Sequence, residues 1–234
     1  MTFYAPFCLP FIIGAAVMFA VLAWKWGTWL YRLPRADKKR ILFGLPTRRT
    51  FGAAWEVVSE SLLHRRIFRV NPLLGYMHMS LAFGWFLLIA VGWAETIAYL
   101  GFRYVPLQGH VFFKYFATGL EHKPFFDFTM DLLLLFVLSG VALAWGKRFY
   151  SRAMGLRRTT KHVLGDRVAL SALWFIFPAR LVAESATCAL YGGGGFLTGG
   201  LGAWMAAHIG MMPLMNLETA AWWFYSSCLG VFFV

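Results

Sequence analysis

The feature that most constrains this chain is a series of apolar stretches, each long enough to cross a bilayer as a helix. The longest covers residues 72–100 and has a single charged side chain, that of Glu95. A hydrocarbon core of about 30 Å needs about 20 helical residues. We therefore predict five membrane spans, at residues 4–31, 72–100, 125–146, 168–190 and 217–234.

The composition supports a membrane protein. Hydrophobic residues make up 60% of the chain, charged residues make up 14%, and the mean hydropathy is +0.63. Soluble domains are about one quarter charged. We expect an all-α integral membrane bundle that forms a single membrane domain over residues 1–234 and is surrounded by lipid. The first apolar stretch has no basic region before it and is longer than a signal-peptide core, so it is predicted to be a retained span.

The distribution of Lys and Arg predicts the orientation of the spans. Residues 32–70 hold ten of them and residues 147–167 hold seven, whereas residues 101–124 hold three and residues 191–216 hold none. Basic connections stay in the cytoplasm. The N-terminus is thus expected outside, residues 32–70 form a basic cytoplasmic connector, and the protein is multi-pass in the cell's inner (cytoplasmic) membrane. Because the net charge of +12 follows the span ends, it predicts contact with anionic lipid and not with nucleic acid.

Three other features limit the kind of site this chain can build. Its cysteines, at positions 8, 188 and 228, are far apart and form no Cys-x-x-Cys pair, so no iron–sulfur cluster is expected in this chain. The glycine-rich residues 192–202 lack a following lysine, which favours a flexible or re-entrant outer loop over a phosphate-binding loop. The last apolar stretch still lacks a polar cap at Val234, which indicates a truncated C-terminus.

His78 is the strongest candidate for a cofactor ligand. It lies inside the predicted span 72–100, and an ionisable side chain within a membrane is a functional candidate by default. It would be an axial ligand of haem iron, and hence a metal ligand, or it would be hydrogen-bonded to a neighbouring helix. A bis-histidine haem needs a second imidazole at similar depth, and no other predicted span contains a histidine.

His64 is a second candidate for cofactor binding. It precedes His78 by fourteen residues, which on one continuous helix would bring it to within about 40° of the same face and about 21 Å away. That spacing would suit two stacked haems. The pair Asn71–Pro72 predicts a break between them. The remaining histidines are interpreted as solvated loop residues: His110, His122, His162 and His208.

Five charged side chains are predicted at similar depth in the outer half of the membrane. Arg180 and Glu184 are one helical turn apart and would neutralise each other. Glu95 lies near the outer end of its span, and Asp127 and Asp131 lie in the first turns of theirs. Together they would line a quinone or proton site. The alternative is a structural ion pair with interfacial carboxylates that face water.

Several short stretches carry a family resemblance through their order and spacing. They are residues 69–72, 77–78, 83–85, 146–151, 158–160, 177–185 and 222–223. In these stretches the chain resembles the membrane cytochrome b subunit of respiratory nitrate reductase (the gamma subunit). It is more similar still to the related domain that opens heterodisulfide-reductase-type membrane iron–sulfur oxidoreductases.

The resemblance implies a b-type haem held between the second and fifth spans, with His78 as its inner-side ligand. The partner histidine of the family would lie at the inner end of the last span, beyond Val234. Leu88 and Tyr225 stand where the family has the ligands of its other haem, so one haem b is expected and a second is not.

These observations lead to one main hypothesis and one rival. The chain would be a membrane electron-transfer subunit, part of a quinone-linked respiratory oxidoreductase. It would exchange electrons between quinone and a cytoplasmic iron–sulfur protein or C-terminal domain. The rival is a haem-free scaffold or transporter-like bundle that uses its buried charges structurally or for ions.

Overall fold

The computed structural model describes residues 3–44, 46–154 and 163–234, so His162 and the resembling stretch 158–160 lie outside the described residues. The described residues contain helices and no strand. The helices are η1 (Pro6–Cys8), α1 (Leu9–Arg32), α2 (Arg35–Phe43), α3 (Arg48–Glu56), the π-helical η2 (Val57–Leu62), α4 (Arg65–Val70), α5 (Pro72–Leu100), α6 (Leu107–Val111), α7 (Phe113–Phe116), α8 (Pro124–Ala153), α9 (Leu164–Tyr191), α10 (Thr198–His208) and α11 (Met211–Phe233).

The predicted all-α membrane fold is confirmed. Four helices are long and apolar enough to cross a membrane, which indicates a multi-pass membrane protein. They cover Pro6–Arg32, Pro72–Leu100, Pro124–Ala153 and Leu164–Tyr191. The helix α11 has 23 residues but is not among these four, so the fifth span stays a prediction.

Proline and glycine mark the ends of the long helices. Pro10, Pro72 and Pro124 lie in the first turns of α1, α5 and α8, where the missing N–H costs no helical hydrogen bond. Gly101 and Gly192 follow the last residues of α5 and α9 with φ of 70° and 81°, a conformation that favours glycine. These five ends of the long helices therefore lie at signals that are visible in the sequence.

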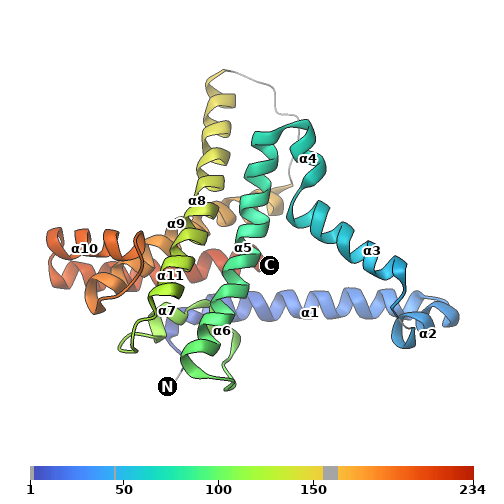
Figure 1. The fold of residues 1–234 in the computed structure, drawn as a ribbon, viewed down its shortest axis with the longest axis horizontal. Helices are drawn as coiled ribbons and strands as arrows, with labels where there is room; N and C mark the ends of the chain where they lie inside the picture. The colour runs from blue at the N-terminus through green and yellow to red at the C-terminus, as the bar shows by residue number, and fades with distance from the viewer. Residues whose placement is uncertain (1–2, 45, 155–162) are drawn as a thin grey trace.

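The long helices form two crossing groups. In Figure 1, α5 and α8 run upright beside each other, whereas α1, α9 and α11 run across the view. The two groups meet near the lower ends of α5 and α8 as drawn, close to α6 and α7. The core and the charged side chains described below lie at this crossing.

The core is built around the indole of Trp222 on α11, which is completely buried. Its ring contacts those of Phe7, Phe112, Tyr115 and Tyr225, with centroids 5.8–5.9 Å apart. Phe112 and Tyr115 belong to the connection between α5 and α8. That connection therefore packs into the protein and closes over the crossing of the helices.

The connector between α1 and α5 is helical and bent. Figure 1 shows α2 and α3 far from the crossing of the long helices, with α4 leading back to the start of α5. The backbone turns sharply at His64, which has left-handed angles (φ 50°, ψ 39°), and is extended at Asn71. The Asn71 side chain accepts a hydrogen bond from Leu74 N and caps α5. The predicted break before Pro72 is confirmed.

Candidate functional site

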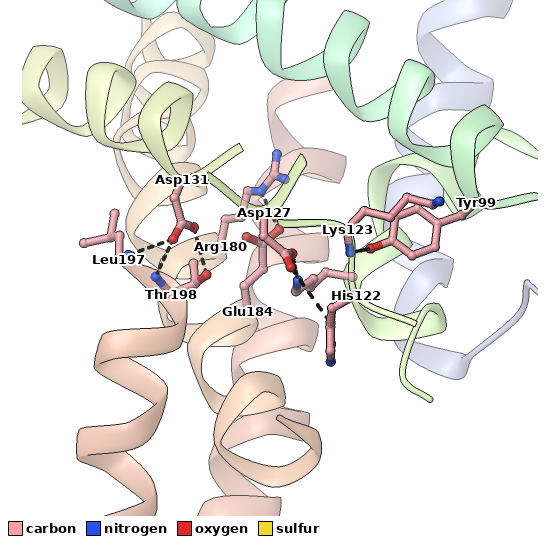
Figure 2. A network of polar contacts seen from close by, with 10 residues as sticks. Tyr99, His122, Lys123, Asp127, Asp131, Arg180, Glu184, Leu197 and Thr198 are labelled. Carbon is pink, nitrogen blue, oxygen red and sulfur yellow. Dashed lines mark hydrogen bonds and ion pairs between the residues drawn. The ribbon is translucent and has the colours of Figure 1, made fainter. Parts of the chain in front are cut away.

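Charged side chains from α5, α7, α8 and α9 line one cavity where the two helix groups cross, and Figure 2 shows those of α8 and α9. All five charged residues predicted for a quinone or proton site line one cavity there, and Lys114 and His110 line it with them. The five predicted residues are Glu95, Asp127, Asp131, Arg180 and Glu184. The structure thus brings together side chains that are up to 89 positions apart in the sequence, and it buries carboxylates for which the sequence had also allowed contact with water.

Arg180 and Glu184 form the ion pair that their spacing on α9 predicts. The Arg180 Nε donates to Glu184 Oε1 at 2.8 Å, and the two side chains are only 12% and 8% exposed. Losing one partner of such a buried pair leaves an uncompensated charge, which costs about 3–5 kcal/mol. The two side chains therefore stabilise the site as an ion pair.

Asp127 has a cationic partner that the sequence did not identify. Lys114 of α7 donates to Asp127 Oδ1 at 2.5 Å, and His122 Nδ1 lies 3.9 Å from Asp127 Oδ2. Burial by itself would lower the pKa of Lys114, but the hydrogen bond and charge of Asp127 outweigh it and raise this pKa. His122 is 49% exposed, so it lies between the buried carboxylate and the surface.

Asp131 uses its carboxylate to hold the start of α10. Oδ2 accepts hydrogen bonds from Leu197 N at 2.7 Å and Thr198 N at 3.0 Å, and Oδ1 accepts one from Thr198 Oγ1 at 2.8 Å. A carboxylate at a helix N-terminus is favoured by the helix dipole. Both oxygens of Asp131 are therefore engaged in joining α8 to α10.

The glycine-rich segment after α9 is built into this arrangement. Gly192, Gly193 and Gly194 all have positive φ, between 79° and 88°. A Cβ added at Gly195 would overlap the Asp131 carboxylate. The segment thus needs glycine for a specific path over Asp131, and the flexible or re-entrant outer loop stays a prediction.

Glu95 is the carboxyl that remains without a direct partner. It is buried, and among the described residues it has neither a hydrogen bond nor an ion pair, although Lys114 and Arg180 act on it electrostatically. The cavity beside it has a volume of about 20 Å³, which is room for about one water molecule. Buried carboxyls of this kind carry protons in membrane proteins.

His110 is not the solvated loop histidine that the sequence suggested. It lines the same cavity as Glu95, and its Nδ1 is buried without a hydrogen-bond partner among the described residues. Burial lowers its pKa, although a hydrogen bond with the backbone of Val105 opposes this. Of the other two described loop histidines, His122 is half-exposed and His208 is exposed.

A further buried carboxyl, Glu218 on α11, was missed by the sequence analysis. The Thr187 hydroxyl donates to Glu218 Oε1 at 2.7 Å and accepts from Trp222 Nε1 at 2.9 Å. Thr187 also lines a second small cavity together with Glu95. The only signal in the sequence was one acidic residue in an otherwise apolar stretch.

The two histidines predicted as cofactor ligands lie together at the other end of α5. Their rings are almost parallel, at 14°, with centroids 5.5 Å apart. The separation of about 21 Å expected for a continuous helix is wrong, because the left-handed turn at His64 and the extended Asn71 fold the chain back. The described residues therefore hold one pair of imidazoles, and not two sites one above the other.

Comparisons of this chain with protein-family models, with curated proteins and with solved structures found no match. The site is therefore interpreted from its own residues.

Proposed function

We propose that this protein is a membrane electron-transfer subunit that binds one b-type haem through His78 and exchanges electrons with a quinone. A cytoplasmic iron–sulfur protein or domain would be the other electron partner, and the cytoplasmic membrane the location. The observation that carries the proposal is that two imidazoles, one of them His78, lie together at one end of α5 and a buried charged cluster lies at the other. A quinone-linked redox subunit needs a ligand for its redox centre and groups that carry protons.

An imidazole at this end of α5 could bind haem iron through one ring nitrogen. Nitrogen ligands bind such metals at about 2 Å, so two imidazoles on opposite faces of one haem have ring centres roughly 6 Å apart or slightly more. The rings of His78 and His64 are stacked with centres 5.5 Å apart, which is not this arrangement, so the proposal rests on His78 as the ligand. When bound, the haem would supply one-electron chemistry, and the protein would tune it through axial ligation and burial.

The charged cluster fits the proton side of quinone chemistry. A quinol that gives up two electrons also gives up two protons. Glu95 lies beside a cavity with room for about one water molecule. Asp127 lines the same cavity and lies next to the half-exposed His122, so these residues lead from Glu95 to the surface. The cavity is too small for a quinone ring. We therefore assign proton transfer to this cluster, and we place the quinone on the side of the cluster that faces lipid.

The haem assignment is tested with a reduced-minus-oxidised visible spectrum and a pyridine haemochrome assay on the purified protein. We expect about one b-type haem per chain, lost in His78→Ala and kept in His208→Ala, which removes an exposed histidine elsewhere. Wild-type and His78→Ala proteins with equal haem content would refute the assignment. A wild-type protein without haem would favour the scaffold or transporter-like alternative.

The proton assignment is tested by following haem reduction by a soluble naphthoquinol. Glu95→Gln should slow the reduction about tenfold or more while haem content stays constant, because Gln cannot carry a proton. The exposed Glu121 in the same region provides the control variant Glu121→Gln, which should behave as wild type. Equal rates for all three proteins would remove Glu95 from the reaction.

A further inference from the structure

We propose that Glu218 on α11 is a second proton-holding carboxyl of this protein, joined to Glu95 through the hydroxyl of Thr187 and a cavity of the size of one water molecule. This inference rests on the proposed proton transfer to quinone and deepens it. A quinone that takes up two electrons also takes up two protons, whereas one carboxyl holds only one. A second acid on the same route supplies the other proton.

The first argument is the compensation of the buried carboxyls. Five carboxyls are buried in the described part of the chain. Three of them are compensated, Asp127 and Glu184 by a cation each and Asp131 by three hydrogen bonds. The other two, Glu95 and Glu218, form no ion pair with any described residue. Because an isolated charge is costly to bury, such a group takes up a proton instead. Each of these two carboxyls is therefore expected to hold one proton.

The second argument is the pair of hydrogen bonds at Thr187. Its hydroxyl donates to Glu218 Oε1 at 2.7 Å and accepts from Trp222 Nε1 at 2.9 Å. An indole N–H only donates, so Trp222 occupies one lone pair of the oxygen and leaves the hydroxyl hydrogen for the carboxyl. The second lone pair remains for a water molecule. All three side chains are at most 6% exposed, so bulk water does not compete for these bonds.

The third argument is the cavity between the two carboxyls. Thr187 and Glu95 both line it, and its volume of about 20 Å³ is room for about one water molecule. Other polar side chains on its wall can hold such a water in place. The titratable side chains that line the cavity are those of Glu95, Tyr99, Lys114, His122 and Tyr191. The half-exposed His122 connects the cavity to the surface.

These contacts allow a balanced proton transfer from Glu218 to Glu95. Once Glu95 has given its proton to the quinone, the cavity water gives a hydrogen to the Glu95 carboxylate and takes the hydroxyl hydrogen of Thr187. The Thr187 oxygen in turn takes the proton of Glu218. The water and Thr187 each break one O–H bond and form another, so the negative charge has moved from Glu95 to Glu218 and nothing else has changed.

The charge state of Glu218 is tested by infrared spectroscopy of the purified protein in H₂O and in D₂O at near-neutral pH. A protonated carboxyl has a C=O band that deuterium shifts, and a carboxylate has no such band. We expect bands from two buried acids in wild type, one of them lost in Glu218→Gln and displaced in Glu218→Asp. The control Glu121→Gln, at an exposed position, should match wild type. The full wild-type pair of bands in Glu218→Gln would show that Glu218 is ionised and would overturn the inference.

The connection through Thr187 is tested by the rate at which the Glu218 band shifts after transfer to D₂O. Thr187→Val keeps the shape of the side chain without its hydroxyl and should slow this exchange about tenfold or more. Thr187→Ser keeps the hydroxyl and should exchange as wild type does. Equal rates in all three proteins would remove Thr187 from the route and overturn the inference. These measurements need neither haem nor quinone, so a wild type without haem would refute the proposed function and not the two buried acids.

Discussion

The carboxylate of Asp131 should be a major contributor to the stability of the helix crossing, and Asp131→Asn isolates its charge. Asn matches Asp in size and can still bond to Leu197 and Thr198. Hydrogen bonds to a charged group contribute about 1.5–3 kcal/mol each, against about 0.5–1.5 for neutral groups. With three such bonds and a side chain only 2% exposed, we expect the variant to lose about 2–3 kcal/mol.

The loss can be measured as a shift in the apparent Tm of the detergent-solubilised protein. One kcal/mol corresponds to about 2–4 °C for a chain of this size, so Asp131→Asn should melt roughly 5–10 °C below wild type. Thr198→Val removes one of the three bonds and should lose about 1 kcal/mol. Asp166→Asn, at an exposed position in the first turn of α9, should shift the Tm by less than about 2 °C. If Asp131→Asn melts within 2 °C of wild type, the assigned role of this carboxylate is wrong.

Three further predictions concern packing, charge and pH. Gly14→Val should lower the Tm by more than about 6 °C, because an added Cβ would lie 2.6 Å from the Cα of Gly230; a native Tm would contradict this close helix contact. Arg180→Gln should cost about 3–5 kcal/mol by leaving Glu184 buried without its cation, as measured by denaturant titration, and a neutral effect would show that Glu184 is compensated elsewhere. Because burial lowers the pKa of His110, the folded state takes up this proton less readily than the unfolded chain does. Stability should therefore fall as the pH drops below about 6.5, and His110→Gln should flatten that part of a Tm-against-pH curve.

The sequence could predict the four helices that are long and apolar enough to cross a membrane and much of the charged cluster, because both follow from counting along regular helices. Pro72 and Gly101 mark the two ends of α5, and Gly192 marks the end of α9. The positions of Glu95 and Arg180 along their helices could therefore be read from the sequence, and both residues line one cavity.

Residues outside the long helices could not be placed in this way. Lys114 lies in a four-residue helix that has no periodic pattern of its own, and its burial depends on contacts made by distant segments. The distance between His64 and His78 could not be predicted, because the left-handed backbone at His64 adds to the break at Asn71 and no local signal marks a histidine for that conformation. Both failures arise where tertiary packing overrides local preference.

The contact between α1 and α11 determines the order in which these two helices can be assembled during synthesis. The Phe11 N–H, one of the unpaired donors at the start of α1, donates to Ser226 Oγ of α11 at 3.2 Å, across 215 positions of sequence. Ribosomes add about 5–20 residues per second, so the partner arrives roughly 10–40 s after Phe11 itself. During that interval the first helix has to wait in the bilayer, where lipid tails can cover its apolar face. Synthesis of α11 is therefore the event that fixes α1 in place, and a ribosome that stalls before α11 would leave α1 without this hydrogen bond.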